Sequence, residues 1–233
     1  MFPNVVEERS YRDRVRIFED RAHAGELLAL KLQKYSRSPD AILFAIPSGG
    51  IPVALTIARA LGIPLDVAVV RKAQIPWNPE AGFGAVAWDG ETVLNEPLME
   101  RLGLGRAAIE GAISMAKAIV EDRLRRFRGD KPFPDLRGKT AIIVDDGLAS
   151  GFTMLAAVRA VRRMGPRAVV VAVPTASSEA IALLAPEVDG LICLNIRGGP
   201  IFAVADAYRH WRDVPDEEAL GALERARREG IAI

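Results

Sequence analysis

The sequence predicts an α/β fold: a doubly wound, mainly parallel sheet of about five strands that is flanked by helices. Short apolar runs alternate with helical patterns along most of the chain, which is typical of parallel strands joined by helical crossovers. No internal repeat, low-complexity tract or change of composition marks a linker within the 233 residues. We therefore expect residues 1–233 to form a single domain.

The first half of the chain begins with a predicted amphipathic helix over residues 22–35, where leucines recur among charged residues. An uninterrupted apolar run predicts a buried strand over 41–46. Residues 51–61 predict the next helix, because Gly62 follows them as a helix-ending residue. A second strand is expected over 65–70.

The middle of the chain has a different composition. Residues 73–83 contain two prolines and a glycine, so they predict a loop. Residues 85–94 predict a hairpin, because Asp89-Gly90 is a favourable tight turn. A long helix over 106–127 and a connection rich in glycine and proline come next.

The second half returns to alternating strands and helices. Strands are expected over 140–144, 168–173 and 190–194, and helices over 152–164, 177–184 and 216–228.

The charge balance excludes a strongly basic or acidic protein. Lys and Arg number 31 against 30 Asp and Glu, so no net field draws the chain to nucleic acid or to an anionic membrane. No apolar run approaches the roughly 20 residues of a membrane helix, and the N-terminus does not resemble a signal peptide. One cysteine and two histidines disfavour disulfides and zinc sites. These observations predict a cytoplasmic protein without nucleic-acid or membrane partners.

The most informative segment is the run 142–153, in which an apolar strand ends in Asp145 and Asp146. A short turn with small residues and two hydroxyls follows, and a helix then begins. The unpaired N–H groups of a first helical turn bind phosphate well, particularly where small residues allow close approach. The two carboxylates suit the vicinal hydroxyls of a polyol, held directly or through a metal ion.

This segment resembles the 5-phosphoribosyl 1-diphosphate (PRPP) motif of the type I phosphoribosyltransferases. The resemblance implies that Asp145 and Asp146 hold the ribose hydroxyls, with Mg²⁺ nearby, and that the following residues bind the 5′-phosphate. The matching residues are Gly147, Leu148, Ala149, Ser150, Gly151, Phe152 and Thr153. The alternative is an acidic pair that caps a helix, as in a receiver domain, but receiver domains lack the hydroxyl–glycine–hydroxyl turn.

Two further segments support the resemblance. Ser48, Gly49 and Gly50 follow the first predicted strand and form a second backbone anion nest, which in the family contacts pyrophosphate. An ordinary strand-to-helix turn is the alternative. Relatives often carry a basic residue where this chain has Ser48. Arg71 and Lys72 end the next strand and are expected to neutralise the diphosphate, unless they form only a solvated strand end.

The remaining expectations concern the parts that cover the site. The resemblance implies a flexible lid over about 73–84, with Glu80 as a participant, and a hood over about 195–212. Aromatic side chains of the hood either stack on an acceptor or simply pack; they are Phe202, Tyr208 and Trp211, with His210 between them.

Several stretches together resemble a subgroup of small prokaryotic predicted phosphoribosyltransferases of undefined acceptor. The implied activity is transfer of the phosphoribosyl group from PRPP, with Mg²⁺, to a nitrogenous acceptor, and the implied assembly is a homodimer. Ala149 stands where 6-oxopurine enzymes of the family carry an acid, which argues against a hypoxanthine or guanine acceptor. The alternative function is a non-catalytic regulator that senses PRPP or a nucleotide. The lid and the Arg71-Lys72 pair favour the enzyme, because a sensor needs no cover that excludes water.

Overall fold

A computed structural model describes residues 2–199 and 201–233, and the side chains of Pro79 and Glu80 lie outside its described part. Six strands form the main sheet, in the order β1-β9-β8-β7-β2-β3, and every neighbouring pair is parallel. These strands are β1 (Val5–Glu7), β2 (Ala41–Ala45), β3 (Leu65–Val67), β7 (Thr140–Val144), β8 (Ala168–Ser177) and β9 (Gly190–Arg197). The predicted doubly wound, mainly parallel sheet is confirmed.

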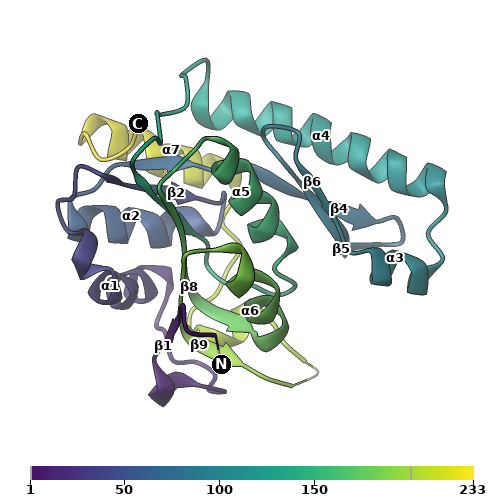
Figure 1. The fold of residues 1–233 in the computed structure, drawn as a ribbon, viewed down its shortest axis with the longest axis horizontal. Coiled ribbons are helices and arrows are strands. Elements are labelled where there is room, and N and C mark those ends of the chain that lie inside the picture. The colour runs from purple at the N-terminus through teal and green to yellow at the C-terminus, as the bar shows by residue number, and fades with distance from the viewer. Residues whose placement is uncertain (1, 200) are drawn as a thin grey trace.

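Helices cover both faces of this sheet (Figure 1). One face carries α1, α2 and α7, whose apolar sides join a buried cluster that includes Leu28, Ile57 and Leu223. The opposite face carries α5 and α6, with Leu155 and Leu184 in a second cluster. Their bounds are α1 (Arg21–Lys31), α2 (Gly50–Leu61), α5 (Phe152–Arg163), α6 (Ser178–Leu184) and α7 (Asp216–Arg228).

A second, antiparallel sheet extends from the domain together with two helices (Figure 1). We call this region the arm. It consists of β4 (Val70–Ile75), β5 (Asn78–Ala87), β6 (Thr92–Leu94), α3 (Glu96–Leu102) and α4 (Arg106–Arg128). Ala73, Ile75 and Phe83 form a small core of their own, against which apolar residues of α3 and α4 pack.

The arm corrects two predictions. Residues 73–83 form most of a hairpin instead of a loop. The side chains of β4 alternate in burial as in a strand, since Ala73 and Ile75 are buried whereas Lys72 is exposed. Two register shifts within β4 and β5 absorb the irregular sequence. The strand expected over 65–70 breaks after Val67, where the chain leaves the main sheet and begins β4.

Other differences are smaller. The sheet has a sixth strand, β1, whose three residues are too short to show a pattern in the sequence. α3 was not predicted. The first helix ends at Lys31, and residues 33–35 continue as a 3₁₀ turn. The predicted turn at Asp89-Gly90 is confirmed, since β5 and β6 pair across it and Gly90 has a φ of 87°.

Candidate functional site

A cavity of about 740 Å³ lies beyond the carboxyl ends of β2 and β7. Ligands bind at this edge in open α/β sheets, because the loops that follow neighbouring strands meet there. The cavity walls come from the loop after β2, the loop after β7, strand β4, helix α4 and the segment before α7. The site therefore joins segments from nearly the whole length of the chain.

The loops after β2 and β7 lie in direct contact. A Cβ atom on Gly49 would be 2.1 Å from Oδ2 of Asp146, and one on Gly50 would be 2.7 Å from the carbonyl oxygen of Val144. Both distances are shorter than any side chain tolerates. Glycine at these two positions is what allows the acidic pair and the loop after β2 to lie side by side.

Burial raises the pKa of both Asp145 and Asp146 above the usual range of a carboxyl group. The charge of Asp146 raises the pKa of Asp145 further, whereas Arg21 partly offsets the effect on Asp146. Asp145 Oδ1 accepts a hydrogen bond of 2.8 Å from the backbone N–H of Asp146. Two carboxylates held together in this way favour a ligand that brings hydrogen-bond donors or positive charge.

Asp146 is held by residues from both ends of the chain. Arg21, at the start of α1, donates to its Oδ2 from Nε and Nη2, each at 2.8 Å. The guanidinium of Arg21 also lies 3.9 Å from the ring centroid of Trp211. The hydroxyl of Tyr208 donates to the carbonyl oxygen of Asp146 at 2.6 Å. These contacts fix the orientation of the carboxylate before any ligand binds.

The segment 147–153 forms an open turn before α5. Its first part is anchored on β8, because Leu148 exchanges backbone hydrogen bonds with Thr175 and Ser177, and Ser177 Oγ donates to the carbonyl oxygen of Ala149 at 2.6 Å. Gly151 has a φ of 81°, a left-handed conformation that side chains other than glycine adopt at a cost.

The first turn of α5 is available to an anion. No side chain among residues 2–199 and 201–233 caps it, while Ala149 and Ser150 stay exposed on the rim. The free N–H groups and the positive end of the helix dipole favour a phosphate at this point.

Arg71 and Lys72 bring positive charge to the same cavity from β4. Nε of Arg71 is buried, and no hydrogen-bond partner for it exists among the described residues. A buried donor without a partner costs free energy, so this atom favours an incoming acceptor. The side chain of Glu80, which was expected to participate, lies outside the described residues.

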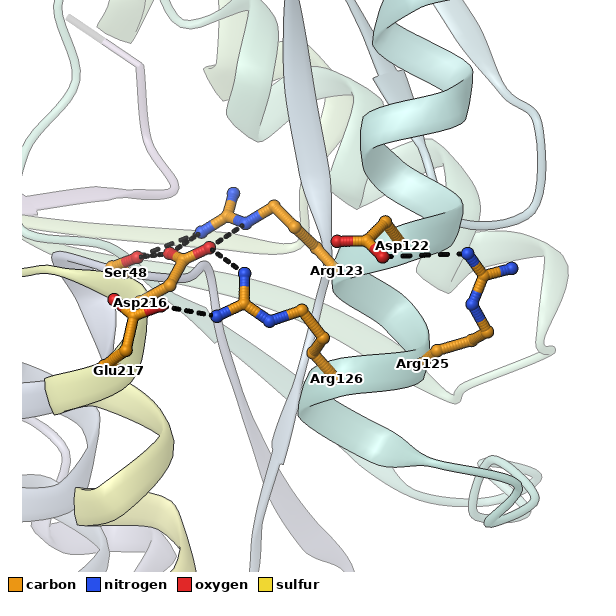
Figure 2. A network of polar contacts seen from close by, with 7 residues as sticks. All are labelled: Ser48, Asp122, Arg123, Arg125, Arg126, Asp216 and Glu217. Carbon is orange, nitrogen blue, oxygen red and sulfur yellow. Dashed lines mark hydrogen bonds and ion pairs between the residues drawn. The ribbon is translucent and has the colours of Figure 1, made fainter.

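Ser48 meets two elements that the sequence did not associate with it (Figure 2). Its hydroxyl donates to Oδ1 of Asp216, the first residue of α7, and accepts a hydrogen bond of 2.9 Å from Nη2 of Arg123 in α4. Arg123 also donates to both carboxylate oxygens of Asp216, at 3.0 and 2.8 Å. Position 48 lacks a basic side chain, but Arg123 places a positive charge beside it.

Most of the residues proposed from the sequence line this one cavity. It is lined by Ser48, Gly49, Arg71, Lys72, Asp145, Asp146, Gly147, Leu148, Ala149, Ser150, Gly151 and Thr153. Gly50 and Phe152 lie behind this lining, Gly50 in the contact between the loops and Phe152 against the core under α5.

The aromatic candidates separate into different roles. Trp211 lines the cavity, whereas Tyr208 is buried and packs against Phe18, with ring centroids 5.5 Å apart. His210 is exposed, and Phe202 lies beside the guanidinium of Arg197, 5.1 Å from it. Only Trp211 of these four remains placed to contact a ligand in the cavity.

Sequence reasoning missed the roles of Arg21, Arg123, Arg126 and Asp216, which also line the cavity. Arg21 opens a helix just after Asp20, which caps that helix, and an arginine at such a position gives no signal of its own. The others lie on helices whose charged residues look like solvated surface. Their proximity to Ser48 depends on how α4 and α7 pack.

Two further features of the chain bear on its class. Burial raises the pKa of the Cys193 thiol far above its usual value, so this cysteine stays protonated. Within the described ranges, the structure contains no helix that is long and apolar enough to cross a bilayer.

A parallel doubly wound sheet with an acidic pair and an open, uncapped turn at its carboxyl edge is typical of the phosphoribosyltransferase class. Residues 16–183 match the family profile described as phosphoribosyl transferase domain. The chain belongs to the phosphoribosyltransferase family, and its sheet is that of the type I fold.

Known proteins agree with this assignment. Two proteins of Mycobacterium tuberculosis, from strains CDC 1551 / Oshkosh and H37Rv, are each provisionally named a phosphoribosyl transferase. Each is 37% identical over 215 residues, which are 92% of this chain and 48% of the relative. The chain thus spans about half the length of these relatives. The crystal structure of TT1426 from Thermus thermophilus is 35% identical, with a TM-score of 0.70 over 89% of this chain and 98% of that one.

Proposed function

We propose that this chain uses PRPP and Mg²⁺ as donor and cofactor. It transfers the phosphoribosyl group to a nitrogenous small-molecule acceptor and releases pyrophosphate. One observation carries the proposal. The acidic pair and the phosphate-binding turn share a single cavity with Arg71, Lys72 and Arg123, so one side suits ribose 5-phosphate and the other a diphosphate. We call these the ribose-phosphate end (Asp145 to Thr153) and the diphosphate end (Ser48, Gly49, Arg71, Lys72, Arg123 and Arg126).

In this proposal the ribose-phosphate end fixes the sugar. The 5′-phosphate accepts hydrogen bonds from the N–H groups of residues 149–153 and from the hydroxyls of Ser150 and Thr153. The carboxylates of Asp145 and Asp146 accept from the two ribose hydroxyls, in addition to the hydrogen bonds that they receive from the backbone N–H of Asp146 and from Arg21. Arg21 holds Asp146 in place, so little reorganisation is needed when the sugar binds.

The diphosphate end stabilises the leaving group. As the bond from C1 of the ribose to the diphosphate breaks, negative charge gathers on the diphosphate and positive charge on the sugar ring. Arg71 and Lys72 neutralise the negative charge on the diphosphate, and the two aspartates face the positive charge on the sugar ring. Catalysis in this scheme is positioning and electrostatic stabilisation, without a covalent intermediate on the chain.

The residues present fit Mg²⁺ only as an ion shared with the substrate. Among the described residues, no cluster of three or more acidic, histidine or cysteine side chains surrounds a point in space. Mg²⁺ commonly takes one or two carboxylates and completes its shell with phosphate oxygens and water, and Asp145 and Asp146 are the cavity carboxylates that we propose for this role. When bound, the ion would neutralise diphosphate charge.

The acceptor enters beside Trp211 and Val204, which line the cavity next to Gly147. We propose that it presents a ring nitrogen as nucleophile. Ala149 offers no acid to accept a proton from a 6-oxopurine, so adenine-like, pyrimidine-like and other nitrogenous acceptors fit better.

We propose further that the β4–β5 hairpin shields the reacting centre from water. It lies on the diphosphate side through Arg71, Lys72 and Gln74, and its turn carries Trp77, 64% exposed. Because the hairpin packs on α3 and α4, closure would move the arm as a unit instead of a free loop.

The decisive experiment measures pyrophosphate release from PRPP and Mg²⁺ across a panel of nitrogenous bases and small amines. We expect release with at least one acceptor, and loss of release when Mg²⁺ is chelated. Calorimetric binding of PRPP without turnover on any acceptor would instead support the sensor. Failure to bind either PRPP or ribose 5-phosphate would contradict both functions.

A further inference from the structure

Asp216 occupies the diphosphate end with a negative charge of its own (Figure 2). Its carboxylate accepts two hydrogen bonds from Arg123 and one from the hydroxyl of Ser48. Arg126 adds an ion pair at 3.5 Å. One carboxylate thereby engages three donors that line the cavity where a diphosphate would need donors.

These donors are placed like the ligands of a bound anion. Arg123 is only 9% exposed and presents the edge of its guanidinium, a geometry that suits a phosphate as well as a carboxylate. Ser48 lies in the loop after β2, next to Gly49, and both residues line the cavity. Arg71, on another wall of the cavity, has a buried Nε for which the described residues offer no partner.

Asp216 is charged under ordinary conditions. Burial by itself raises the pKa of its carboxyl, but hydrogen bonds from Arg123 and Ser48 outweigh burial and hold the pKa below its usual value. Asp216 also lies at the N-terminus of α7, where the helix dipole favours a negative charge. The carboxylate is thus a stable resident of the site in the absence of ligand.

We propose that Asp216 is a built-in competitor of the diphosphate group. This inference rests on the proposed function and adds a further step. An arriving diphosphate takes Arg123, Arg126 and the Ser48 hydroxyl from Asp216, and the α7 carboxylate returns when pyrophosphate leaves. Competition of this kind lowers affinity for donor and product alike, and so favours product release.

Calorimetric titration of the full chain with inorganic pyrophosphate tests the proposal without requiring an acceptor. Asp216→Asn keeps the size and one acceptor oxygen but removes the charge. We expect it to bind pyrophosphate about tenfold more tightly than the parent, since charge-assisted hydrogen bonds to Arg123 no longer have to be exchanged. Arg123→Gln should weaken binding by about tenfold for the complementary reason.

Glu217→Gln is the matched control. Glu217 is the next residue in the first turn of α7 and pairs with Arg126 at 2.9 Å, but its side chain is 79% exposed. Its removal deletes the same charge and the same interaction with the helix dipole. We expect a change in pyrophosphate affinity of less than about twofold, because exposed ion pairs contribute little.

The double variant Arg123→Gln with Asp216→Asn tests whether Asp216 lowers pyrophosphate affinity by engaging Arg123. If Asp216 competes through Arg123, its replacement should bring little gain once Arg123 is absent. An equal gain in both backgrounds, or unchanged affinity in Asp216→Asn alone, would overturn the proposal. Ribose 5-phosphate binding is measured in parallel. If the proposed function were wrong, the parent chain would bind neither ligand, whereas failure of the competition alone would leave both ligands bound.

Discussion

The ribose-phosphate end of the cavity and its diphosphate end differ in how far apart their residues lie in the sequence. Asp145 to Thr153 is one continuous strand–turn–helix segment. The diphosphate end draws Ser48 from the loop after β2, Arg71 from β4 and Arg123 from α4, and Asp216 of α7 lies against it. The first end keeps its geometry through local backbone structure and anchoring on β8, whereas the second depends on how the arm and α7 pack.

This difference implies different sensitivities. Changes in the arm should affect the diphosphate end and spare the ribose-phosphate end. Changes at the contact between the loops after β2 and β7, where Gly49 meets Asp146, should affect the ribose-phosphate end first.

The double replacement Asp145→Asn with Asp146→Asn should reduce PRPP affinity at least about 100-fold, since each charge-assisted hydrogen bond contributes about 1.5–3 kcal/mol. Calorimetry measures the loss directly. Asp122→Asn is the control, because Asp122 lines the same cavity but pairs with Arg125 at the surface, 3.7 Å away. Wild-type affinity in the double variant would show that the acidic pair serves only the fold.

Phe83→Ala should destabilise the arm by about 3 kcal/mol, because this fully buried ring is the largest side chain of the small core. Urea denaturation gives the stability. Pyrophosphate affinity should fall, because β4 carries Arg71 and Lys72, while ribose 5-phosphate affinity should stay within about twofold of the parent.

Trp77→Ala provides the comparison within the same hairpin. This exposed side chain should change the free energy of unfolding by less than about 0.5 kcal/mol. If Phe83→Ala lowered the affinities for pyrophosphate and ribose 5-phosphate equally, the diphosphate end and the ribose-phosphate end would not be separable.

Gly49→Ala should lower ribose 5-phosphate affinity about tenfold, because the new methyl group displaces the Asp146 carboxylate from its place beside Arg21. Gly111→Ala is the matched control. Gly111 lies on the exposed side of α4, where an added methyl group would meet no atom within 4 Å, so alanine there should stabilise the helix by about 0.5–1 kcal/mol. Unchanged affinity in Gly49→Ala would argue against the tight contact between the loops.

A separate effect on stability depends on pH. The pKa of Asp145 is raised in the folded chain. At pH values above the usual carboxyl pKa of 3.8, the folded state therefore retains a proton that the unfolded state releases. Stability from this group is therefore lost as pH rises towards the folded pKa. Asp145→Asn removes the loss, and its Tm without ligand should exceed that of the parent by a margin that grows with pH.

Asp146→Asn should differ from Asp145→Asn at neutral pH, although burial raises the pKa of both carboxyls, because Asp146 is the one that pairs with Arg21. It removes the ion pair of the buried Arg21 and should lower stability by about 1–3 kcal/mol. Scanning calorimetry at several pH values distinguishes the two variants. Equal Tm values for both would contradict the different roles of the two carboxylates.

Much of the fold was predictable because strand and helix periodicity is local. β2, β7 and the helices α2, α4 and α5 fall within a few residues of their expected positions. The hairpin over 73–83 was not predictable from its prolines and glycine, since the register shifts and the packing of Phe83 on α3 and α4 decide its structure. A three-residue strand such as β1 carries too little pattern to recognise.

The sequence alone indicated the family and the parallel sheet, and it located the segment 145–153 that we propose as the ribose-phosphate end, because this continuous run carries both the backbone turn and its polar side chains. The sequence did not reveal that Arg21 holds Asp146, or that Arg123 places a positive charge beside Ser48 while Asp216 engages it. Long-range ion pairs of this kind are set by how helices pack. A charged residue on a helix reads the same in the sequence whether it faces solvent or a cavity.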